Sequence, residues 1–133
     1  VGRTFIKPTQ KERQSAVHLK LSVLSSVVKG KRLVLIDDSI VRGTTMASLI
    51  RMLKDAGATE VHVRISSPPF LFPCYYGTDV PSNDQLIASS HTAAEICASI
   101  GADSLGYMKL EDLKQMTGDL PLCKACFDSH YPV

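Results

Sequence analysis

Two adjacent carboxylates, Asp37 and Asp38, follow an apolar run and precede a loop rich in hydroxyl groups. Adjacent acids can accept hydrogen bonds from vicinal hydroxyls or hold an oxygen-preferring cation such as Mg²⁺. Gly43 permits a tight backbone, and Thr44 and Thr45 supply hydroxyls where a helix is predicted to begin. Free N–H groups and the positive end of the dipole at a helix start favour a phosphate. The segment therefore predicts a site for a sugar and a phosphate.

The elements on either side of this loop would place it at the edge of a sheet. Residues 33–36 are apolar toward both faces, which predicts a central parallel strand covered by helices on both sides. Apolar residues at i, i+3, i+4 and i+7 predict an amphipathic helix from about Thr44 to Gly57. Ligands of open α/β sheets bind where strands end. A ligand-free strand, polar turn and capped helix is the alternative, but the complete pattern of twelve residues favours a binding site.

The rest of the chain predicts further strands and helices in alternation. Period-two alternation predicts strands at 17–23 and 61–65, and a last short strand is expected at 105–110. Helices are expected at 9–13, at 92–100 behind a capping box of Thr92 and Glu95, and at 111–116. Prolines make residues 68–77 a loop. The order indicates an α/β fold with a mainly parallel sheet and right-handed crossovers.

Composition restricts the size and the class of the protein. The 133 residues, 44% of them hydrophobic, can build one modest core. The net charge of +2 is too small to indicate a nucleic acid or a membrane surface as partner. No apolar run has transmembrane length and no secretory leader is visible, so a cytoplasmic protein is expected. The first residue is Val1, which suggests a cut from a longer polypeptide.

Four cysteines would remain reduced in the cytoplasm, which directs attention to metal binding. Cys123 and Cys126 form a C-x-x-C pair that can place two thiolates on one metal centre. A redox pair would normally open a helix after a strand, unlike this one. Cys74, in the proline-rich loop, is the better third ligand, because Cys97 lies on the apolar face of a predicted helix. The fourth position stays open to a cysteine outside this chain, His91 or His130.

Residues 34–45 resemble the phosphoribosyl pyrophosphate (PRPP) motif of type I phosphoribosyltransferases, in which two acids and a Gly-Thr-Thr loop follow an apolar strand. The resemblance implies that fold, incomplete at its N-terminal side because its sheet includes strands from before Val1. It also implies that Asp37 and Asp38 bind the ribose hydroxyls and Mg²⁺. The 5′-phosphate would be held by the loop that follows, which consists of Ser39, Ile40, Val41, Arg42, Gly43, Thr44 and Thr45.

Further segments are similar to the glutamine PRPP amidotransferase family, nearly from end to end: 1–6, 57–62, 65–69, 73–77, 86–90 and 123–127. This resemblance implies that residues 1–118 are the C-terminal portion of a phosphoribosyltransferase domain and that 119–133 form a cysteine-bearing tail packed on it. Arg3 and Thr4 match the loop that closes over PRPP. In the iron–sulfur members four cysteines hold a [4Fe-4S] cluster. Cys74, Cys123 and Cys126 match three of them, and the fourth ligand lies outside this chain.

The same resemblance implies an activity. Ammonia, freed from glutamine by a glutaminase domain not in this chain, would displace pyrophosphate from PRPP to give 5-phosphoribosylamine, the first committed step of de novo purine synthesis. Purine nucleotides would inhibit, and the full-length enzyme would be a homo-oligomer. The isolated chain is expected to bind PRPP weakly and to make no phosphoribosylamine. The alternatives are a non-catalytic PRPP or nucleotide sensor and a small zinc module on the cysteines and a histidine.

Overall fold

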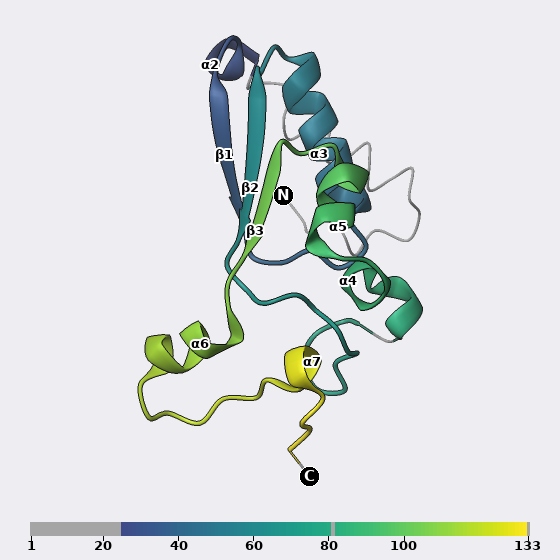
Figure 1. Ribbon diagram of the computed structural model, residues 1–133, viewed down its shortest axis with the longest axis vertical. Helices are drawn as coiled ribbons and strands as arrows, with labels where there is room; N and C mark the ends of the chain where they lie inside the picture. Colours follow the sequence, from purple (N-terminus) through teal and green to yellow (C-terminus); the bar gives the residue numbers. More distant parts are fainter. Residues whose placement is uncertain (1–24, 81, 133) are drawn as a thin grey trace.

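Three parallel strands form the centre of the molecule, seen in a computed structural model that describes residues 25–80 and 82–132 (Figure 1). They are β1 (Arg32–Asp37), β2 (Glu60–Ile65) and β3 (Ser104–Tyr107), in the order β1-β2-β3. Helix α3 (Thr44–Asp55) connects β1 to β2, and α5 (Ala93–Ile100) precedes β3. This alternation is the α/β arrangement with a parallel sheet that the sequence predicts.

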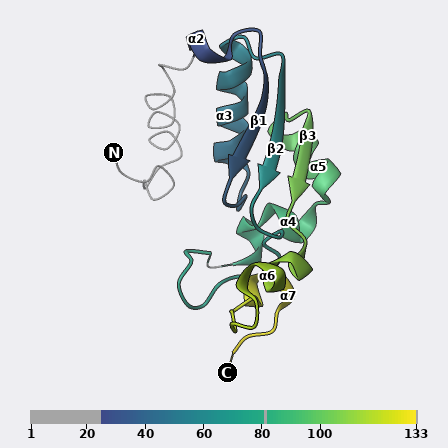
Figure 2. The ribbon, with the colours of Figure 1, turned by 90° about the vertical axis from the view of Figure 1, so that its left-hand side faces the viewer.

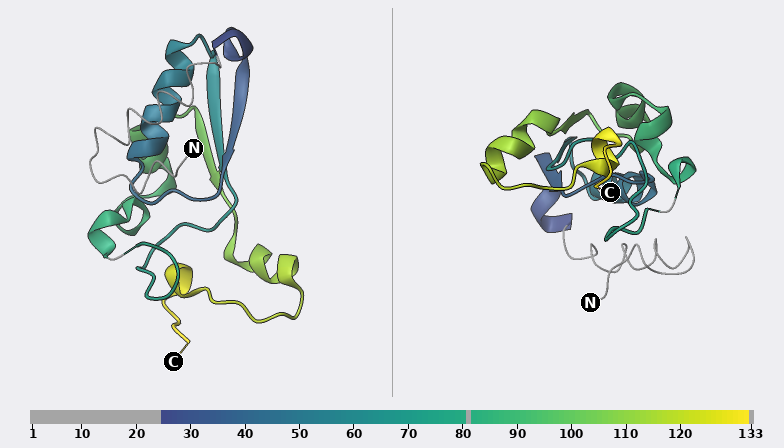
Figure 3. Two further views of the ribbon diagram at one scale, coloured as in Figure 1. Left: turned by 180° about the vertical axis from the view of Figure 1, so that it is seen from behind. Right: turned by 90° about the horizontal axis from the view of Figure 1, so that it is seen from below.

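Five shorter elements complete the described part of the chain. Helix α6 lies apart from α3 and α5, and none of its residues is buried (Figure 3). The carboxyl ends of all three strands point toward α4, α6 and α7 (Figure 2). The five elements are α2 (Ser25–Val28), the 3₁₀ helix η2 (Asn83–Gln85), α4 (Ile87–Ser90), α6 (Leu110–Thr117) and α7 (Ala125–Asp128).

The main core lies between the sheet and the helices on one of its faces. Alternate residues of β2, Val61, Val63 and Ile65, are almost completely buried. Ile50 of α3 and Ile96 of α5 belong to the same cluster and are each 1% exposed. Burying one such aliphatic side chain contributes about 1.5–3 kcal/mol. These contacts hold α3, and therefore the loop at its N-terminus, against the strands.

The opposite face of β1 is uncovered within the described residues, so this part of the chain supplies helices on one side only of the expected two. Val34 is 65% exposed and Ile36 is 72% exposed, whereas Leu33 and Leu35 pack on the core. The reason is that β1 pairs only with β2 among the described strands, and α3 and α5 share the other face. Among the described residues, β1 is therefore an edge strand with one apolar face exposed.

A second apolar cluster lies beyond the carboxyl ends of the strands. Its buried members are Phe70, Val80 and Leu86. The rings of Phe70 and Phe127 pack with their centroids 5.2 Å apart. The backbone N–H groups of residues 71 and 72 both donate to the Cys126 carbonyl, at 2.9 and 3.0 Å. The C-terminal tail is thereby joined to the proline-rich loop.

Most predicted elements are present, with different ends. The capping box of α5 is confirmed, because Thr92 Oγ1 accepts from the Glu95 N–H at 3.2 Å and Glu95 Oε1 accepts from the Thr92 N–H at 3.0 Å. The strand predicted at 105–110 is shorter, since Leu110 already begins α6. The short elements α2, η2, α4 and α7 were not predicted. The helix expected at 9–13 and the strand at 17–23 lie outside the described residues.

Candidate functional site

The paired carboxylates are exposed where β1 ends. The backbone N–H of Asp38 donates to Asp37 Oδ1 at 2.8 Å, and Ser39 Oγ donates to Asp38 Oδ1 at 3.0 Å. The Asp37 carbonyl accepts from the N–H of Ser66, just beyond β2, at 3.0 Å. Neither carboxylate forms an ion pair with another described residue. Each carboxylate thus accepts a hydrogen bond from the residue that follows it and keeps oxygen lone pairs for a ligand.

The pKa of Asp37 lies above its ordinary value. Desolvation of the carboxyl raises this pKa most, and the adjacent charge of Asp38 raises it further, against the lowering effect of the Asp38 N–H bond. Two neighbouring acids without a cation repel each other, so the ionised pair is favoured when a positive charge arrives. This is the electrostatic condition expected of a site for Mg²⁺ or for a developing positive charge.

The loop ends at a helix start that no side chain caps. Gly43 is the N-cap of α3, with φ of 83°, and its carbonyl accepts the first helical hydrogen bond, from Ala47, at 2.9 Å. By helix geometry the N–H groups of Thr44, Thr45 and Met46 have no acceptor within the helix. Thr44 and Thr45 are exposed at this end. Three free donors at the positive end of a twelve-residue helix can bind an anion.

Two residues of the predicted loop have side chains that hold the loop in place. Ile40 is 3% exposed and belongs to the main core. Val41 packs against the second cluster, and its carbonyl accepts from the Ile87 N–H at 2.9 Å. A ligand at this loop would therefore meet the backbone of residues 40 and 41 rather than their side chains.

Sequence reasoning missed two residues at this site. Ser66 fixes the end of β1, as described above, and Gln85 Oε1 accepts a hydrogen bond from Arg42 Nη2. Both contacts join residues far apart in the chain, so no local pattern could have revealed them. Ser66 could have been suspected, because it directly follows a predicted strand neighbouring the one that ends in Asp37.

Cys74 and Cys126 pack against the second cluster, and Cys123 is exposed. Burial raises the pKa of Cys126 to about 11, and the negative charges of Cys74 and Cys123 raise it as well. Hydrogen bonds from the backbone of Tyr76 and Thr78 lower the pKa of the Cys74 thiol. All four cysteines are free. Even so, among the described residues no group of three or more His, Cys, Asp or Glu side chains is placed to hold a metal ion. The predicted metal ligands remain a prediction.

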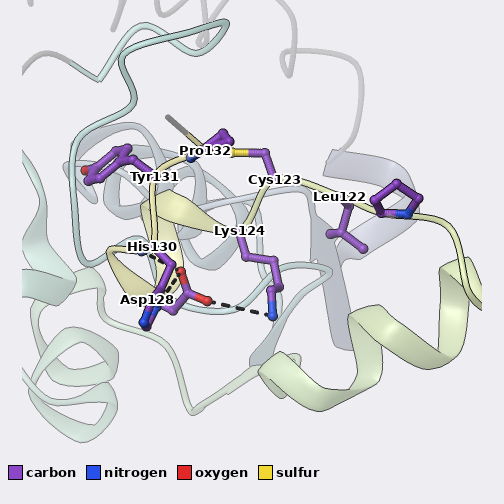
Figure 4. A pocket seen from close by; sticks show the side chains of 8 residues that line it. Leu122, Cys123, Lys124, Asp128, His130, Tyr131 and Pro132 are labelled. Atoms are coloured by element: carbon purple, nitrogen blue, oxygen red, sulfur yellow. Dashed lines mark hydrogen bonds and ion pairs between the residues drawn. The ribbon is translucent and has the colours of Figure 1, made fainter.

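The surroundings of Cys123 form a shallow hollow in the C-terminal tail (Figure 4). Asp128 lies 3.7 Å from Lys124 Nζ and 3.5 Å from His130 Nδ1. The backbone N–H of His130 is the main cause of the lowered pKa of Asp128, followed by the charges of His130 and Lys124. Cys97 lies on α5 instead, where its thiol donates to the Ala102 carbonyl at 3.3 Å.

Known proteins are similar to this chain in sequence and in fold. The model of the phosphoribosyl transferase domain matches residues 3–66, which include β1, the two acids and the loop. The amidophosphoribosyltransferase of Synechocystis is 52% identical over the whole chain, and that of Methanocaldococcus jannaschii is 54% identical over 99% of it. The chain belongs to the amidophosphoribosyltransferase family. It spans 27% and 28% of the length of these two relatives.

Solved structures of the family agree with the fold. Glutamine PRPP amidotransferase from B. subtilis, complexed with ADP and GMP, superposes with a TM-score of 0.76 at 46% identity. The match covers 98% of this chain and 30% of that chain. The sheet, α3 and the loop between β1 and α3 thus form part of a phosphoribosyltransferase domain. One relative, from Glycine max, is named as chloroplastic, so a cytoplasmic location stays a prediction. No helix in the described part is long and apolar enough to cross a membrane.

Proposed function

We propose that this chain carries the ribose 5-phosphate half of the PRPP site of a glutamine PRPP amidotransferase. The observation that supports it most is a succession within nine residues: two carboxylates that form no ion pair with another described residue, then a helix start without a side-chain cap. The carboxylates match the diol of a ribose, and the free N–H groups match its 5′-phosphate. The relatives' family name supports the same substrate.

Each residue of the site would have a distinct role. Asp37 and Asp38 would accept hydrogen bonds from the ribose hydroxyls and hold Mg²⁺, and the N–H groups at the start of α3 would bind the phosphate. Bound Mg²⁺ would neutralise charge on the pyrophosphate. The raised pKa of Asp37 fits this role, because a nearby cation would restore the ionised form. Positioning the sugar in this way fixes its C1 relative to the incoming nucleophile.

The reaction needs little acid–base chemistry from this chain. When ammonia displaces pyrophosphate, positive charge develops on the ribose ring, and the carboxylates of Asp37 and Asp38 can stabilise it. Ammonia would come from a glutaminase domain that is not in this chain. Arg3 and Thr4, outside the described residues, would belong to a loop that closes and excludes water.

Regulation and assembly follow from the family in the same way. A B. subtilis relative was crystallised with ADP and GMP, which supports purine nucleotides as inhibitors of this protein. A homo-oligomer, a cytoplasmic location, and the absence of nucleic acid and membrane partners complete the proposal. We also propose that the chain divides into a domain portion, residues 1–118, and a tail, residues 119–133.

Titration calorimetry with PRPP and Mg²⁺ tests the substrate site. Combining Asp37→Asn with Asp38→Asn should weaken binding at least about tenfold, because a hydrogen bond to a charged group contributes roughly 1.5–3 kcal/mol. Asp55→Asn, at the far end of α3, is the matched control and should bind normally. Unchanged affinity in the double variant would refute the assignment of the carboxylates.

The iron–sulfur part of the proposal is supported by the C-x-x-C spacing of Cys123 and Cys126 and by the position of Cys74 and Cys126 against the same apolar cluster. The described residues do not assemble a complete site, so no step of the reaction is derived through a cluster. Anaerobic reconstitution with iron and sulfide should give broad absorption near ~400 nm. Cys126→Ser should abolish that absorption, while Cys97→Ser should preserve it. A colourless zinc adduct would favour the zinc module instead.

A further inference from the structure

The loop of residues 39–45 is called the phosphate loop below. The segment of η2 and α4, residues 83–90, contacts the middle of this loop, although the two are about forty positions apart in the chain. Three consecutive loop residues, Val41, Arg42 and Gly43, are touched from this one segment. The contacts involve backbone, side chain and apolar packing. A loop held at three successive residues has little freedom to change the direction of its N–H groups.

The backbone and apolar contacts come from Ile87. Its N–H donates to the Val41 carbonyl at 2.9 Å. Its Cδ1 lies 3.3 Å from the position that a Cβ on Gly43 would occupy, so the Ile87 side chain rests against the Gly43 backbone. The neighbouring Leu86 is 1% exposed in the second cluster, where Val41 also packs. Ile87 is therefore held both by its contacts with the loop and by the burial of the adjacent Leu86.

The side-chain contact is the hydrogen bond from Arg42 Nη2 to Gln85 Oε1. Gln85 belongs to η2, where its own N–H bonds to the Ser82 carbonyl at 3.3 Å and the Leu86 N–H bonds to the Asn83 carbonyl at 3.0 Å. The Arg42 side chain thus contacts an acceptor that a hydrogen-bonded turn carries. Because Arg42 immediately precedes Gly43, holding its side chain also constrains the backbone that leads into α3.

We infer that Gln85 is a positioning residue for the 5′-phosphate, which acts through Arg42 to fix the backbone of the phosphate loop. This inference rests on the proposed function and extends it to a segment outside the PRPP motif. Gln85 would not touch the substrate. Replacing Gln85 should lower the affinity for a ligand that carries the 5′-phosphate and should not change the affinity for the sugar alone.

Titration of the protein with ribose 5-phosphate, and with ribose as the ligand lacking the phosphate, tests the inference. Gln85→Ala should weaken ribose 5-phosphate binding about three- to tenfold, the range expected for the loss of one hydrogen bond. Binding of ribose should not change. Gln85→Glu keeps an oxygen acceptor for the guanidinium and should restore the affinity. Gln115→Ala, an exposed glutamine of α6, is the matched control.

A double-mutant cycle shows whether Gln85 acts through Arg42. In an Arg42→Ala background, Gln85→Ala should have no further effect on the affinity for ribose 5-phosphate. Additive losses, or equal losses for ribose and ribose 5-phosphate, would overturn the inference. So would normal affinity in Gln85→Ala. If the unmodified protein binds neither PRPP nor ribose 5-phosphate, the proposed function itself fails, and that outcome is distinct from the failure of Gln85 alone.

Discussion

Replacing Gly43 with alanine should lower both the affinity for ribose 5-phosphate and the free energy of unfolding, because of one backbone angle. The φ of 83° places Gly43 in the left-handed region, which costs a residue with a side chain about 1–2 kcal/mol. The new Cβ would lie 3.3 Å from Ile87 Cδ1 and 3.5 Å from Ile100 Cγ2. The first contact is tight, but Ile87 Cδ1 is the far end of a flexible side chain and can yield. The backbone angle therefore supplies most of the cost.

Relief of that strain would turn the peptide groups at the start of α3. We expect the free energy of unfolding of Gly43→Ala to fall by about 1–2 kcal/mol, measured by urea denaturation. Ribose 5-phosphate binding should weaken by more than about tenfold, which corresponds to roughly 1.4 kcal/mol. The two effects have one origin, because the glycine that tolerates the angle also directs the N–H groups toward the phosphate.

Gly30→Ala is the matched control. Gly30 has a φ of 73°, and an added Cβ would meet no heavy atom within 4 Å. It precedes β1, away from the phosphate loop. We expect a similar loss of stability with unchanged ligand affinity. If Gly43→Ala binds ribose 5-phosphate as well as Gly30→Ala does, the reasoning that links this angle to phosphate binding is wrong.

Two further predictions concern the carboxylates and α5. Since the folded-state pKa of Asp37 is raised, its ionisation destabilises the fold as pH rises from about 3.8 through that pKa, and the cost then persists at neutral pH. Asp37→Asn should accordingly be more thermostable than the parent at pH 7, with the difference vanishing in acid; a constant difference across a pH series of melting curves would contradict this. Thr92→Ala removes one half of the capping box and should lower the free energy of unfolding by about 1 kcal/mol, whereas Thr78→Ala, on an exposed loop, should have little effect in the same assay.

Local patterns in the sequence were enough to predict most residues of the candidate site. The run that ends at Asp37, the helical period after Thr44 and the Thr92–Glu95 box each depend on residues close together in the chain. Elements of one turn, such as α4 and α7, are too short to show a period. The uncovered face of β1 also could not be predicted, because an apolar run does not say which of its faces has a partner.

Contacts between residues far apart in the chain also could not be predicted from the sequence. Nothing in the residues around Gln85 indicates that its amide meets Arg42, since that meeting depends on how α4 and α5 pack on the sheet. The same applies to Ser66 and the Asp37 carbonyl. Sequence reasoning therefore located the groups that would face the ligand and missed the groups that hold them.

The second apolar cluster gives the phosphate loop and the C-terminal tail a common support. Val41 of the loop and Cys126 and Phe127 of the tail all pack against it. Amide hydrogen exchange at residues 71 and 72, whose N–H groups bond to the Cys126 carbonyl, would report each opening of the tail. If the tail opens only when the cluster loosens, a ligand on the loop must slow that exchange by reciprocal linkage. Ligand binding at the loop and exposure of Cys126 would then depend on one local unfolding equilibrium.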